Sequence, residues 1–218
     1  MSEAPKPPPP PPTDETDFQF GGYVEGAAAR TIPDGVGFWP RFLARIIDTV
    51  AHTMVGLMTW LMMGVMVGTS AAATGGDIQA IVRKMETSSP LDFVVAIVGF
   101  VAYHTILEGL HGSSLGKMLL GQVVVTDQVQ PCGVGAAFIR SVAYFVDGLF
   151  FGVVGYLEMK KTRLEKRHGD NWAHTFVARR IQVPINALRG TGRFVLVLLL
   201  ALAVDSAIHM TWIVVKMM

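Results

Sequence analysis

Four ionisable side chains lie at regular spacing near the start of the first long apolar segment. They are Arg41, Arg45, Asp48 and His52. A helix turns about 100° per residue, so this spacing places all of them on one face. Charged groups are costly against lipid, so the face must contact protein, water or the membrane interface. A carboxylate between an arginine and an imidazole can bind a cation or exchange a proton. The structural alternative is that the arginines bind lipid phosphates and Asp48 neutralises one of them.

Other apolar segments contain similar groups. His104, Glu108 and His111 also share one helical face. Three loosely spaced ligands suit zinc poorly, so we expect no metal site. A proton or ion relay and an exposed structural cluster both stay open as interpretations. Asp205 and His209 are four residues apart in the last apolar segment, where they form either an internal hydrogen bond or a relay.

A second Arg–Asp pair repeats the spacing of the pair in the first segment. Arg140 and Asp147 are seven residues apart, as are Arg41 and Asp48. Internal repeats build many transporters around a central site. Chance similarity in a chain of biased composition is the alternative interpretation.

The composition favours a membrane protein. The chain has 218 residues, of which 51% are hydrophobic and 16% charged, whereas soluble domains average about 25% charged. The net charge of +1 gives no reason to expect nucleic acid as a partner. The single cysteine excludes an intrachain disulfide and a cysteine-rich metal site.

Segments of about 20 apolar residues can span a bilayer as helices. Residues 42–67, 91–110 and 194–215 meet this requirement. Segment 134–158 is also apolar but is interrupted by glycines and charges. We therefore expect an all-α integral membrane protein with three to four membrane helices, and a small β-hairpin insertion near 122–131.

The distribution of basic residues bears on the topology. Arg41, Arg45 and the basic loop 159–193 all favour the cytoplasmic side. Three full crossings between them would put them on opposite sides. A re-entrant 134–158 removes this conflict, and an external N-terminus is the alternative. A re-entrant backbone must be covered by protein or water.

Three motifs together resemble the RDD family of small bacterial membrane proteins. They are GFWPRFLARIID at 37–48, SLGKMLLGQVVV at 114–125 and RHGDNWAHTFV at 167–177. The family takes its name from one Arg and two Asp. Arg41 and Asp48 match the first two, and Asp170 is taken as the second Asp, with Asp147 as its rival. The resemblance covers about 36–183, and His174 stands where the family usually has glycine.

Composition, hydropathy and the extent of the resemblance together predict a division of the chain, and the resemblance implies a location. Residues 1–36 are expected to be a disordered Pro-rich tail, 37–183 an RDD-like membrane domain, and 184–218 an additional C-terminal transmembrane helix. The expected location is the bacterial cytoplasmic membrane, with several crossings.

The resemblance implies transport, including ion antiport. We expect a transporter of small cations coupled to protons, neither an enzyme nor a holder of a cofactor or metal. The alternative is a non-transporting membrane subunit or scaffold. Expected partners are the lipid bilayer, small cations or protons and further copies of the chain, with no nucleic acid. The candidate ion- or proton-binding residues are Arg41, Asp48, Glu108, Asp147 and Asp170. Secondary candidates are Arg45, His52, His104, Arg140, Asp205 and His209.

Overall fold

Helices make up most of the part of the chain that the structure describes. The structure is a computed structural model, and it describes residues 32–87 and 89–217. Of the predicted disordered tail, 1–36, residues 1–31 therefore lie outside the described part of the chain. The helices and one small antiparallel sheet confirm the predicted fold class.

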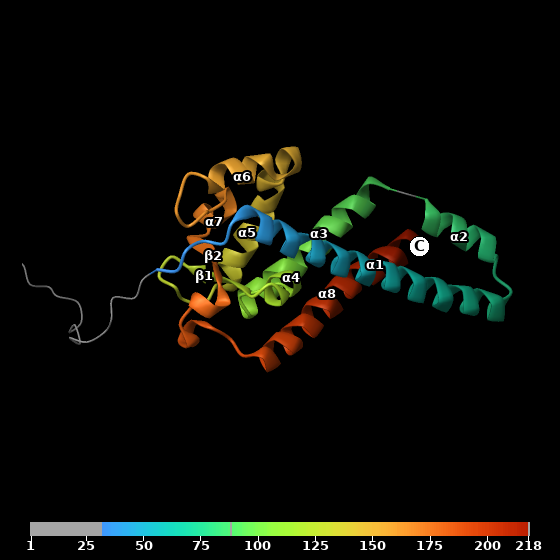
Figure 1. The fold of residues 1–218 in the computed structure, drawn as a ribbon. Helices are drawn as coiled ribbons and strands as arrows, with labels where there is room; N and C mark the ends of the chain where they lie inside the picture. Colours follow the sequence, from blue (N-terminus) through green and yellow to red (C-terminus); the bar gives the residue numbers. More distant parts are fainter. Residues whose placement is uncertain (1–31, 88, 218) are drawn as a thin grey trace, which may run out of the picture. The chain divides into compact units, whose positions relative to one another are not determined.

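Three helices are long and apolar enough to cross a membrane (Figure 1). They are α1 (Phe38–Thr74), α3 (Pro90–Leu110) and α8 (Thr191–Met217), the last within the apolar stretch Ile185–Met217. Each covers a segment predicted to span, so the prediction of three long apolar helices is confirmed. α8 packs against both α1 and α3.

The outward faces of these helices are apolar. Phe93 and Leu196 are each 70% exposed, and Met58 is 57% exposed. Side chains of this kind are stable on an outer surface when lipid covers them. Inside, Tyr103, Leu107 and neighbouring residues of α3 pack against α8.

Local sequence signals explain where the long helices begin and end. α1 continues past the predicted 42–67 and stops at Gly75, whose φ of 70° is left-handed and suits glycine. The short α2 (Ile78–Glu86) follows. At the start of α3, the Ser89 N–H donates to the Asp92 carboxylate at 2.7 Å, and this contact satisfies one free donor of the first turn.

Shorter elements gather beside the N-terminal end of α1 (Figure 1). The helices among them are α4 (Leu115–Leu119), α5 (Val134–Asp147), α6 (Val153–Met159) and α7 (His168–Trp172). The strands are β1 (Gln122–Thr126) and β2 (Thr175–Arg179). The 3₁₀ turns are η1 (Leu149–Gly152), η2 (Arg180–Gln182) and η3 (Ile185–Ala187).

The small sheet differs from the predicted hairpin at 122–131. β1 does turn back on itself, because the Thr126 N–H donates to Gln130 O at 2.9 Å and Val125 bridges Pro131. Proline has no N–H to donate, so the returning chain cannot form a full strand there. β1 instead pairs along all five residues with β2, Val124 opposite Val177. The sheet is confirmed, and its second strand comes from much later in the chain.

The interrupted segment 134–158 is broken at its glycines. α5 ends at Asp147, η1 follows, and α6 begins after Gly152, whose φ of 89° is left-handed. The segment is not among the helices long enough to cross a membrane. The break that the sequence predicted is therefore confirmed.

Cys132 offers a simple test of this packing. Its side chain is 0% exposed beside Val124 and Val177, and burial raises the pKa of its thiol to about 11. Only the thiolate reacts readily, so the folded protein should resist iodoacetamide at neutral pH. Labelling should become rapid once SDS unfolds the protein, as mass spectrometry would show. Equal labelling rates before and after unfolding would contradict the buried position.

Candidate functional site

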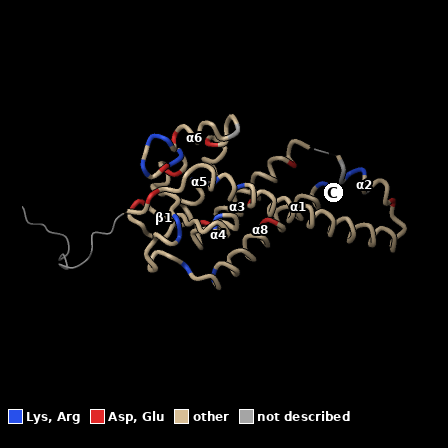
Figure 2. The backbone as a smooth tube through the Cα atoms, viewed as in Figure 1, with Lys and Arg blue, Asp and Glu red and all other residues tan. Residues whose placement is uncertain are grey.

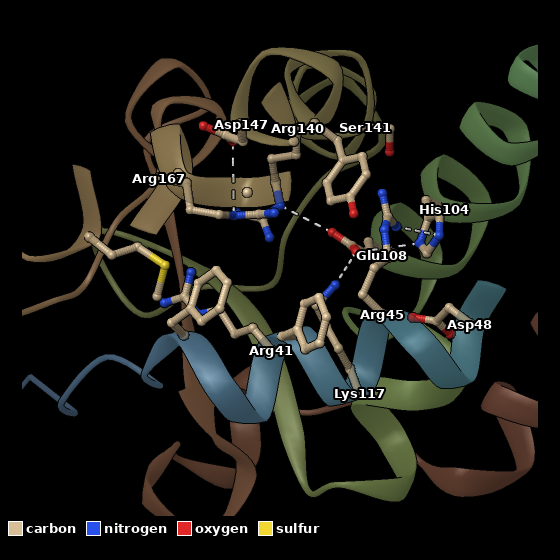
Figure 3. A pocket seen from close by; sticks show the side chains of 17 residues that line it. Arg41, Arg45, Asp48, His104, Glu108, Lys117, Arg140, Ser141, Asp147 and Arg167 are labelled. Atoms are coloured by element: carbon tan, nitrogen blue, oxygen red, sulfur yellow. Dashed lines mark hydrogen bonds and ion pairs between the residues drawn. The ribbon is translucent and has the colours of Figure 1, made fainter. Parts of the chain in front are cut away.

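A cavity lined by charged side chains lies among α1, α3, α4, α5 and α6 (Figure 3). It encloses about 280 Å³. Figure 2 shows charged residues concentrated around these short elements, while most of α1 and α8 carries none. The acidic, basic and histidine residues that line the cavity are Arg41, Arg45, Asp48, His104, Glu108, Lys117, Arg140, Asp147 and Arg167.

Asp170 ties together three elements beside this cavity. Arg41 Nη1 of α1 donates to Asp170 Oδ2 at 2.6 Å, and Arg140 Nη1 of α5 donates to Asp170 Oδ1. The N–H of Arg167, at the start of α7, donates to Asp170 at 3.1 Å. Burial by itself raises the pKa of the Asp170 carboxyl, but Arg140 and Arg41 outweigh it and hold that pKa well below its ordinary value. Asp170 is therefore a charged anchor.

Glu108 forms a second anchor inside the cavity. Lys117 of α4 and Arg140 Nε of α5 both donate to its carboxylate, the latter at 3.1 Å. Figure 3 shows the two cations approaching Glu108 from different elements. Burial lowers the pKa of the Lys117 ammonium, and the neighbouring Glu108 opposes this shift.

Asp147 holds the start of α7. It accepts from the backbone N–H groups of His168 at 3.1 Å and Gly169 at 3.3 Å. Arg167 Nε lies 3.9 Å from its carboxylate. Asp147 and Asp170 thus serve the same short helix, but among the described residues Arg41 forms an ion pair with Asp170 alone.

Asp48 is bound in a different way. It accepts from Ser114 Oγ at 2.6 Å, from Gly116 N at 2.7 Å and from the Tyr103 hydroxyl at 3.4 Å. Within the described residues, no Lys, Arg or His forms an ion pair with it. Its side chain is buried and lines the cavity. Asp48 is therefore held by neutral donors only.

Arg45 lies inside the cavity. Its guanidinium lies 3.4 Å from the centre of the Tyr144 ring and 4.0 Å from that of Phe100. Nη1 is 2.5 Å from His104 Nε2. Two aromatic faces around a guanidinium give cation–π stabilisation. Arg45 thus packs within the protein, which contradicts a role as an anchor to lipid phosphate.

One expectation about the second apolar segment needs correction. His104, Glu108 and His111 are at most 4% exposed, so the exposed cluster is wrong. His111 also packs against Phe194 of α8, with ring centres 4.9 Å apart, away from the cavity. Helical spacing placed the three on one face but could not show how other elements cover it.

Sequence reasoning missed Lys117, Tyr144 and Arg167 as cavity residues. The Gly116-Lys117 pair in the second motif was a usable signal for Lys117. Arg167 opens the third motif, and Tyr144 follows Arg140 at the same spacing as Arg45 follows Arg41, so both also carried a signal in the sequence. His52, Asp205 and His209, by contrast, lie outside the cavity lining and contact one another between α1 and α8.

Comparisons with known proteins identify the family of this chain. The chain is 29% identical over 126 residues to the uncharacterised protein YxaI of Bacillus subtilis (strain 168), covering 56% of this chain and 82% of YxaI. No solved structure matches the chain. The family model named RDD family matches residues 36–174, a stretch that contains Arg41, Asp48, Asp147 and Asp170. This match covers more than half of the chain, which therefore belongs to the RDD family of membrane proteins.

Proposed function

We propose that this protein exchanges a small cation for protons across the bacterial cytoplasmic membrane, with Asp48 as the exchange site. The observation that carries the proposal is the state of this carboxylate. It is buried, it lines the cavity, and within the described residues only neutral donors contact it. A buried carboxylate without a cationic partner is costly when charged, so a proton or a bound cation must neutralise it. Competition between these two is the basis of exchange.

The other carboxylates support the site in this proposal. Glu108, Asp147 and Asp170 each have cationic partners in the described part of the chain. Releasing Asp170 to bind a transported ion would deprive the buried Arg41 of its ion pair, and releasing Glu108 would do the same to the buried Lys117, which is costly. They therefore stabilise the elements that line the cavity. Of the relay expected from the sequence, only Asp48 then exchanges a proton or a cation.

The positive charges that line the cavity determine the affinity of the site for a cation. Arg45 and Lys117 line the same cavity as Asp48 without pairing with it. Their charges oppose entry of a cation and so keep its affinity low. Weak binding allows release on the far side, which transport requires.

The proposal includes the wider role of the chain. It acts as a transporter, with lipid, cations and protons as its partners, and it performs no enzymatic reaction. Three spanning helices enclose little pathway, so several copies of the chain assemble to complete it.

Replacing Asp48 with asparagine tests the proposal. Asp48→Asn keeps the size of the side chain but removes the charge and the exchangeable proton. In proteoliposomes with an imposed pH gradient, we expect the variant to lose Na⁺, K⁺ or Li⁺ flux while remaining inserted. Asp34→Asn removes an exposed carboxylate that pairs with the exposed Arg163, and it should keep wild-type flux.

Two results would count against transport at Asp48. Wild-type flux in Asp48→Asn would exclude this carboxylate as the exchange site. A wild-type protein that shows no flux alone, yet co-purifies with a larger complex, would favour the non-transporting subunit.

A further inference from the structure

We propose that His52, Asp205 and His209 form a binding site for a divalent transition-metal ion of the Zn²⁺ class. The site lies between the long helices α1 and α8. The site is separate from Asp48 and the charged cavity. It goes beyond the exchange function, because it concerns a different kind of ion.

The spacing of the three side chains suits a metal. One ligand atom from each lies within 4.8 Å of the others. His52 Nδ1 is 2.9 Å from Asp205 Oδ2, and His209 Nε2 is 3.8 Å from Asp205 Oδ1. Bonds of about 2.0–2.1 Å in tetrahedral geometry place ligand atoms roughly 3.3 Å apart. The observed distances lie on both sides of this value, so small side-chain rotations would complete the site.

Asp205 lacks a permanent positive partner. Its side chain is 0% exposed, and among the described residues only the two histidines form ion pairs with it. Its Oδ1 atom is buried and accepts no hydrogen bond from the part of the chain that the structure describes. Leaving a carboxylate oxygen unsatisfied in an apolar interior is costly. A divalent cation between Asp205 and the two imidazoles would neutralise this charge.

Glycines on the neighbouring helices make room for the cluster. A Cβ atom at Gly99 of α3 would lie 2.3 Å from Asp205 Oδ1. A Cβ at Gly56, one turn after His52 on α1, would lie 3.5 Å from His209 Nε2. Small residues let membrane helices approach closely. The backbones of α1 and α3 therefore enclose the three ligands.

The cluster lies deep within the helices that carry it. Asp205 is 12 residues from the nearer end of α8, about 18 Å along the helix axis. His52 lies 14 residues from the start of α1. Ionisable groups at such depth are rare in membrane helices and mark functional sites.

The chemical types of the three ligands indicate which class of ion would bind. Two imidazole nitrogens and one carboxylate suit Zn²⁺ and related metals, whereas Na⁺, Mg²⁺ and Ca²⁺ prefer oxygen ligands alone. Three protein ligands leave a fourth position of a tetrahedral zinc ion open to water or another donor. Asp205 and His209 lie outside the residues matched by the family model, so this site depends on the added helix α8.

Metal titration of the purified full chain in detergent tests the inference. Metal-free protein would be titrated with Zn²⁺ by calorimetry and with Co²⁺ by visible absorption. We expect one saturable Zn²⁺ site per chain and the intense Co²⁺ bands of tetrahedral coordination. Asp205→Asn and His209→Gln should each weaken Zn²⁺ binding by roughly tenfold or more, since even residues that only support a ligand contribute about that much.

A matched histidine provides the control. His174 is exposed and lies outside the cluster, so His174→Gln should bind Zn²⁺ as the wild type does. Thermal unfolding without metal would verify that every variant is folded. The inference is overturned if the wild type shows no saturable Zn²⁺ binding, or only octahedral Co²⁺ bands. It is equally overturned if folded Asp205→Asn and His209→Gln both retain wild-type affinity.

Discussion

Arg140→Ala should destabilise the folded protein by about 3–5 kcal/mol, the range for breaking a buried ion pair. The Arg140 side chain is buried and donates to Glu108, Asp170 and Thr175. Burial by itself lowers the pKa of its guanidinium, but the carboxylates of Asp170 and Glu108 outweigh this and raise it. Its removal leaves two buried carboxylates with fewer positive partners.

Arg140→Lys should recover only part of this loss. A guanidinium has donors in a fixed fork and can bridge two carboxylates, whereas an ammonium is a single point of charge. A lysine at this position could not reach Glu108, Asp170 and the Thr175 hydroxyl together. The order of stability should therefore be wild type, then Arg140→Lys, then Arg140→Ala.

Unfolding by SDS in mixed micelles, followed by circular dichroism, would measure both variants. Arg163→Ala is the matched control, because Arg163 forms an ion pair with Asp34 in which both side chains are exposed. Exposed pairs contribute little, so the control should unfold like the wild type. Equal stability of Arg140→Ala and Arg163→Ala would show that the buried network does not hold the short elements together.

Gly116→Ala should have the second large effect, a loss of about 3 kcal/mol, at the upper end of the usual range for overpacking. A Cβ at this position would lie 2.0 Å from Ala44 O and 2.7 Å from Ala44 C. Both are backbone atoms of α1, so no side-chain rotation relieves the clash. α4 must move away from α1, and the hydrogen bond from Gly116 N to Asp48 is then stretched or lost.

The same unfolding assay and the flux assay would measure the consequences of Gly116→Ala. Gly135→Ala is the control, because nothing lies within 4 Å of a Cβ there and the residue is in the first turn of α5. Glycine to alanine at an unstrained helical position is neutral or stabilises by about 0.4–1 kcal/mol. If Gly116→Ala kept wild-type stability and flux, the close approach of α4 to α1 would be contradicted.

Features that depend on nearby residues could be predicted from the sequence. Length and hydropathy indicated the three long apolar helices, because a helix that crosses a bilayer must be long and apolar whatever surrounds it. Glycines in 134–158 indicated the break that occurs there. Helical spacing placed Arg41, Arg45 and Asp48 on one face, and all three line the cavity.

The pairing of charges depended on contacts that no local pattern contains. Arg41 lies two turns from Asp48, yet its partner is Asp170, 129 residues later. His52 continues the same stripe but pairs with Asp205 of α8. Helical periodicity states which way a side chain points from its own axis. Burial and hydrogen bonding across the whole fold decide which element packs against that side chain. Only the tertiary structure therefore shows that, among the described residues, no cation forms an ion pair with Asp48, whereas Arg140 pairs with two carboxylates.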